Sequence, residues 1–231
     1  MKRMVLCLII FLGVAFPLLI NGCMPRRALT TEQTSLSPIK VERIGVMPFL
    51  KGKNYANIDD PTDRTLNCRL DQLCFNTDNL QSKADEILTR FMWNAMEKKF
   101  GERLVPHDNA IELYKKIVID RDSDTPRSLA RKLGKELKAH HMVLGVVWRY
   151  RDRVGSAIAV ERPASVAFAI YAIHVESGGK LWKRVFDQTQ QSLSENVLNA
   201  PDFFKHGAKW LTASELAKLG LNKTLKTLPL K

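Results

Sequence analysis

The residues of this chain best suited to chemistry are its four cysteines, and their surroundings decide what each can do. Cys7 lies within an apolar run near the start of the 231-residue chain, and Cys23 follows the end of that run. A short basic segment precedes the run, which is typical of a targeting segment that is later removed. A transmembrane helix needs about 20 apolar residues, whereas this run is shorter and contains Pro17. We therefore predict a signal peptide over residues 1–22.

The residues that lead to Cys23 have a recognisable order. Ile20-Asn21-Gly22-Cys23 resembles the lipobox of bacterial lipoproteins, in which an aliphatic, a variable and a small residue precede the cysteine that is lipidated. The resemblance implies that Cys23 becomes the acylated N-terminus. The residue after Cys23 is Met24 and not an aspartate. By the same resemblance, this implies that the protein is anchored in the outer membrane and faces the periplasm. Several acyl chains bury enough methylenes, at about 0.8 kcal/mol each, for stable anchoring.

The two later cysteines lie in an acidic and polar stretch. Cys68 and Cys74 form a close, even pair, which in an oxidising compartment indicates a disulfide that closes a short loop. A redox or metal-binding pair is the alternative, but the spacing is not C-x-x-C and no histidine lies nearby. We predict a structural Cys68–Cys74 disulfide.

The remaining candidates for catalysis form no motif. The chain has no H-E-x-x-H, no G-x-S-x-G and no phosphate-binding glycine loop. His140 and His141 are adjacent at the start of an expected strand, so their side chains point to opposite faces. Three carboxylates could be assembled into a glycoside hydrolase pair, namely Glu161, Asp187 and Glu195. Nothing else marks them, so we predict no enzyme, no catalytic residue, no cofactor and no metal.

Charge is the strongest compositional feature. The formal net charge is +12, and removal of Lys2 and Arg3 with the signal leaves +10. Such a balance raises nucleic acid as a partner, but the basic residues are spread along the chain and an exported lipoprotein rarely meets DNA. We predict no nucleic-acid partner. The positive charge fits better with an envelope partner, namely anionic phospholipid, lipopolysaccharide, peptidoglycan or an acidic polysaccharide. An ordinary solvated surface is the simplest explanation of the charge.

The elements that must position these residues follow from the apolar periodicity. Residues 23–41 lack an apolar period and form a lipidated tether, and residues 42–231 form a single periplasmic domain. Strands are expected at 43–49, 104–106, 142–148, 166–175 and 180–186, the last two as an antiparallel hairpin. Helices are expected after Ser82, over 108–119, from Pro126, and within 201–207 and 212–228, with a long polar loop at 50–79. The pattern predicts an α/β fold with a mixed sheet of four to five strands packed with helices.

The connection from Val154 to Ser165 stands apart from these elements. It is mostly apolar, and arginines flank it. If it is exposed, it forms a patch that seeks a partner; if the strands extend through it, it is a buried hairpin. Both alternatives stay open. The residues of the possible partner surface are Val154, Ile158, Val160, Arg151, Arg153 and Arg162.

Three weak motifs resemble one group of envelope proteins. They are Val46 to Phe49 ending a strand, Val143 to Val147 in a buried strand, and Gly178-Gly179 before Trp182. Together they resemble the domain shared by the curli secretion lipoprotein, the Pel export lipoprotein, the penicillin-binding-protein activator lipoproteins and the N-terminal domain of TolB, over about residues 42–190.

The resemblance implies a TolB N-terminal-like sandwich and a non-catalytic component of an export or envelope-maintenance system. Its partners would be the membrane, through the N-terminal lipid, and further copies of itself or another envelope protein. An accessory of peptidoglycan synthesis is the alternative, and a carbohydrate-active hydrolase a more distant one.

Overall fold

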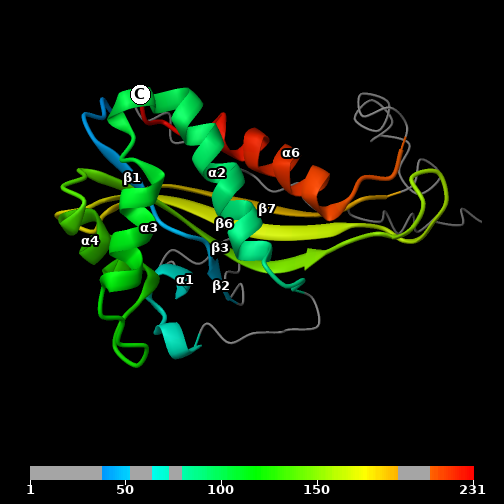
Figure 1. The fold of residues 1–231 in the computed structure, drawn as a ribbon, viewed down its shortest axis with the longest axis horizontal. Coiled ribbons are helices and arrows are strands. Elements are labelled where there is room, and N and C mark those ends of the chain that lie inside the picture. The colour runs from blue at the N-terminus through cyan, green and yellow to red at the C-terminus, as the bar shows by residue number, and fades with distance from the viewer. Residues whose placement is uncertain (1–37, 53–63, 73–79, 192–208) are drawn as a thin grey trace, which may run out of the picture. The chain divides into compact units, whose positions relative to one another are not determined.

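The computed structural model describes residues 38–52, 64–72, 80–191 and 209–231. They belong to one compact unit, Leu36–Lys231. The elements in chain order are β1 Ile44–Val46, β2 Leu50–Lys51, α1 Arg64–Asn67, α2 Ala84–Phe100, α3 His107–Lys116, α4 Pro126–Glu136, β3 His141–Arg151, β4 Val154–Gly155, β5 Val160–Arg162, β6 Ser165–His174, β7 Lys180–Thr189 and α6 Ala213–Leu225, with 3-10 turns at Leu70–Gln72 and Gly101–Arg103 (Figure 1).

A five-stranded mixed sheet forms the centre of the unit. Its order is β1-β3-β6-β7, and β2 also pairs with β3. β1 and β2 run parallel to β3, whereas β3, β6 and β7 are antiparallel neighbours. The predicted α/β class with four to five strands is confirmed, as is the antiparallel hairpin of β6 and β7. β3 is central and almost entirely buried, as its continuous apolar sequence predicts.

Helices cover both faces of this sheet. Phe168 on β6 stacks on Phe186 of β7, and the Phe186 ring lies against Gly220 of α6. Val147 is the register partner of Phe168, so it shares that face. Because side chains alternate along a strand, Met142 points the other way, where its side chain meets Gly134 of α4. Figure 1 shows α2 and α6 crossing the same side of the strands.

Close approach explains one glycine of β3. A Cβ built on Gly145 would lie 2.3 Å from the ring of Phe49, which itself packs edge-on against Phe168 at a centroid separation of 6.0 Å. Any larger residue would therefore displace the ring from the core. This explains why the apolar run of β3 is interrupted by a glycine.

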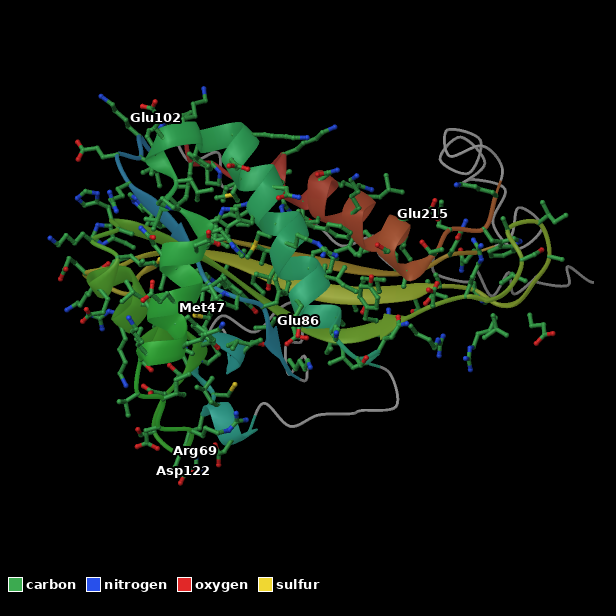
Figure 2. All side chains as sticks on the ribbon, in the orientation of Figure 1. Met47, Arg69, Glu86, Glu102, Asp122 and Glu215 are labelled. Carbon is green, nitrogen blue, oxygen red and sulfur yellow. The ribbon has the colours of Figure 1, made fainter. Side chains whose placement is uncertain are left out.

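Two helix starts are confirmed in detail. The Thr125 hydroxyl accepts from the Ser128 amide, and Pro126 occupies the first turn of α4. Thr212 and Glu215 form the predicted capping box of α6, where Figure 2 labels Glu215. The predicted box at Ser82 and Asp85 is wrong, because α2 begins after Lys83, which has a left-handed φ of 63° and makes no side-chain cap.

The expected polar loop at 50–79 and strand at 104–106 need correction. Leu50–Lys51 is a strand, because its backbone pairs with Val146 and Val147 of β3. Helical turns follow at Arg64–Asn67 and Leu70–Gln72. Leu104 makes only an isolated parallel bridge to Ile44. α3 also ends earlier than expected, at Lys116, and the helix expected at 201–207 lies outside the described residues.

The buried apolar cluster lies wholly within Val41 to Leu230. The ends of the unit are tied to each other, since the amides of Ile39 and Val41 donate to the carbonyls of Pro229 and Lys231 at 2.9 and 2.8 Å. The boundary between tether and domain after residue 41 stays a prediction. The backbone pairing with the C-terminal segment begins two residues earlier, at Ile39. A chain of residues 24–231 thus keeps every residue of this core.

Candidate functional site: the β4–β5 hairpin

The connection between β3 and β6 forms a small hairpin at the end of the sheet. β4 pairs with β5 in a separate two-stranded sheet, with Val154 opposite Arg162. β3 enters it at Arg151, whose partner on β6 is Ser165. In Figure 1 the hairpin projects as the yellow-green loop beyond the long strands. The segment is thus a hairpin in a sheet of its own with an exposed tip, and a partner for it stays a prediction.

Hydrogen bonds order the turn of the hairpin. The Ser156 amide donates to the Ala159 carbonyl at 2.7 Å. The Ser156 hydroxyl accepts from the amides of Ile158 at 3.3 Å and Ala159 at 3.0 Å. Gly155 has a φ of +105°, and a Cβ there would lie 2.6 Å from the Ala159 oxygen, so this position requires glycine.

This turn presents an apolar side chain to solvent. Ile158 is 89% exposed and Val154 is 38% exposed; apart from Val118, they are the large exposed hydrophobic residues of the described chain. Val160 and Ala157 are half-buried beside them, and Ala159 is exposed. Isolated exposed apolar residues are common. An ordered turn that holds several of them at one tip is a stronger sign of an interaction surface.

Contacts with the segment before α6 hold the base of the hairpin. The Asp152 carboxylate accepts from the amides of Arg153 and Ala213, both at 2.9 Å. The Arg153 guanidinium donates to the Trp210 carbonyl, and the Trp210 amide donates to the Ala157 carbonyl at 2.8 Å. The hairpin is therefore attached to a segment that lies far from it in sequence.

The structure brings the six residues of the predicted partner surface to this one region. Arg162 is exposed on β5, and Arg151 and Arg153 are half-buried before β4. Asp152 and Ser156 were not among the predicted site residues. The Gly-Ser pair at the turn was a usable signal, whereas the contact of Asp152 with α6 has no counterpart in the local sequence.

The structure describes two of the three candidate carboxylates, Glu161 and Asp187, and places them on different strands. Glu161 is exposed on β5. Asp187 lies on β7 and forms an ion pair with Arg149, whose Nε donates to Ser165 at 2.7 Å. Glu195 lies outside the described residues. Asp187 thus takes part in a contact between strands.

His141 and His174 pair across β3 and β6. They are register partners, and their rings meet edge to face at 5.4 Å. Burial, followed by the nearby His174 and His140, lowers the pKa of His141. The expectation that His140 and His141 separate fits their burial, since His141 is buried and His140 exposed. Within the described ranges, no three His, Cys, Asp or Glu side chains are grouped to hold a metal.

The predicted covalent sites lie largely beyond the described ranges. Cys23 and Cys74 are outside them, so lipidation and the disulfide stay predictions. Sγ of Cys68 lies 3.3 Å from the Thr65 carbonyl, and burial raises the pKa of its thiol. Among the described helices, none has the length and apolar character needed to cross a bilayer.

Comparisons with known proteins find similarity in structure and none in sequence. No family model and no curated protein matches the chain. A PelC dodecamer from Paraburkholderia phytofirmans has a TM-score of 0.46 at 12% identity, covering 85% of this chain and 92% of that one. The LpoB C-terminal domain from Escherichia coli has a TM-score of 0.39 at 12% identity, covering 68% of this chain and 90% of that one. Lipoprotein GNA1162 from Neisseria meningitidis has a TM-score of 0.40 at 11% identity, covering 72% of this chain and 96% of that one.

The neighbours thus include PelC, a member of the group that the sequence motifs resemble. Similarity at this level assigns no activity and no partner to this chain.

Proposed function

We propose that this chain is a lipid-anchored component of the bacterial cell envelope that acts by binding and assembly and not by catalysis. Cys23 carries the lipid at the outer membrane, and the α/β domain faces the periplasm. The observation that carries the binding role is the ordered β4–β5 tip, with Ile158 89% exposed. The lipobox-like sequence before Cys23 supports the anchor.

The contacts of the candidate catalytic groups support the non-catalytic role. Asp187 is paired with Arg149. His141 is 7% exposed and packs against His174. A general base has to be within reach of the proton that it abstracts, and these two groups are instead directed at neighbouring strands.

Metabolic labelling tests the anchor. We expect the full-length chain to incorporate labelled palmitate and to fractionate with the outer membrane. The matched variant Cys23→Ser should lose the label, whereas Cys68→Ser should keep it. Labelling that persists in Cys23→Ser would contradict the assignment of the anchor.

Light scattering tests the assembly role. The chain of residues 24–231 keeps the whole described core, so it can be studied in solution. We expect self-association, or a complex with another envelope protein recovered by crosslinking. A chain that stays monomeric at high concentration and crosslinks to nothing in the envelope would refute the assembly role.

A further inference from the structure

We propose that the tip of the β4–β5 hairpin inserts into the headgroup region of a bilayer that contains anionic phospholipid. The inference rests on the proposed function, because the lipid on Cys23 keeps the domain beside a membrane. It goes further in naming the ligand of the hairpin surface, whose residues are Val154, Ala157, Ile158, Ala159, Val160 and Arg162.

The tip is organised for insertion before any ligand binds. Three hydrogen bonds within Ser156–Ala159 order the turn that carries Ile158. A turn whose backbone is already ordered loses little further backbone freedom when its apolar side chain is buried. The hydrophobic gain from removing Ile158 from water is therefore not offset by the cost of ordering the turn.

The shape and composition of the tip favour a fluid apolar phase. The hairpin projects past the end of the strands (Figure 1). Its exposed apolar groups, on Val154, Ile158 and Ala159, are aliphatic and include no aromatic side chain. A projecting aliphatic tip needs no pocket of matching shape when it enters lipid, as apolar faces do at membrane interfaces.

The charges around the tip match an anionic surface. Arg162 is exposed directly across the strand pair from Val154. Arg153 lies at the base of the same hairpin, and its guanidinium also donates to the Trp210 carbonyl. Glu161 is the opposing exposed charge, while Asp152 accepts from the Ala213 amide. Arginine stems lie along apolar surface while the guanidinium reaches phosphate, so Arg162 can contact headgroups above an inserted Ile158.

The anchor and the tip can reach the same bilayer. The domain begins pairing at Ile39, which bonds to Pro229, and β1 meets β3 at His141. The hairpin follows the opposite end of β3, about 36 Å away for a strand of 11 residues. The segment of residues 24–38 spans up to about 50 Å when extended. A bilayer holding Cys23 is therefore within reach of Ile158.

Vesicle sedimentation tests the proposal without the anchor. The probe is a chain of residues 24–231 with phosphatidylcholine vesicles, with or without phosphatidylglycerol. We expect binding to the anionic vesicles, a loss of at least about tenfold in Ile158→Asp, and a loss of about fivefold in Arg162→Gln. The matched control is Val118→Asp, because Val118 is 85% exposed elsewhere on the chain and its replacement should leave binding unchanged.

Depth-dependent quenching tests the same contact in the full lipidated chain. In Ile158→Trp, brominated lipids should quench the added fluorescence, and in Val118→Trp they should not. Absence of binding to anionic vesicles, or equal binding by Ile158→Asp, overturns the proposal. If Ile158→Asp instead abolishes self-association, the tip contacts a second copy and the membrane assignment is wrong. Palmitate labelling of Cys23 does not depend on the tip, so failure of the anchor is distinguishable.

Discussion

Removal of the Asp152 carboxylate should destabilise the domain where the hairpin meets α6. One carboxylate oxygen accepts from the amides of Arg153 and Ala213 at 2.9 Å. Ala213 is fully buried at the first turn of α6, so Asp152→Ala leaves its amide without this acceptor. An unpaired buried donor costs about 1–3 kcal/mol. Because Asp152 is itself half-exposed, we expect a value near the middle, about 2 kcal/mol.

Urea unfolding of residues 24–231 measures this loss. With a slope of about 2 kcal/mol/M, the midpoint should fall by about 1 M in Asp152→Ala at an unchanged slope. Asp152→Asn is the matched variant, because its amide oxygen can still accept a hydrogen bond. We expect its loss of stability to be about half of the loss in Asp152→Ala. A midpoint for Asp152→Ala within 0.2 M of the wild type, on the order of the measurement error, would refute the reasoning.

Three further predictions concern the core and its titrating groups. Gly145→Val should destabilise by about 1–3 kcal/mol through overpacking, and Gly179→Ala, whose Cβ would meet only a hydroxyl at 3.2 Å, should change the urea midpoint little. Burial lowers the pKa of His141, so the native state resists its protonation. Stability should therefore decline as pH falls below about 6.5. In His141→Gln, the melting temperature should depend less on pH over this range. The hydrogen bond from Lys209, followed by those from the α6 cap, lowers the pKa of Glu215 to about 2. Its contribution should be lost as pH falls from about 4.5 towards 2, and Glu215→Gln should remove that dependence.

Elements with a strong local signal were predicted well. The apolar run of β3, the Thr125-Pro126 start of α4 and the Thr212 start of α6 depend on side chains within one helical turn or one strand. The start of α2 was misjudged, because Ser82 has a capping side chain but the chain enters the helix through a left-handed Lys83. Backbone conformation at a single residue decided that start, and sequence pattern does not show it.

The short strand β2 could not be predicted for a different reason. Leu50–Lys51 is only two residues long and has no alternation of its own. It is a strand because β3 offers Val146 and Val147 as backbone partners about a hundred residues later. Pairing at such distance depends on the assembled sheet and is absent from the local sequence.

By itself, the sequence determined the α/β class, the antiparallel hairpin of β6 and β7 and the set of residues to examine at 151–162, because periodicity and capping act over a few neighbouring residues. The tertiary structure alone decided that Ile158 stands exposed on an ordered turn, that Asp152 joins the hairpin to α6, and that His141 meets His174. These features are contacts between residues far apart in the chain, and they come into being only when the sheet and its helices pack together.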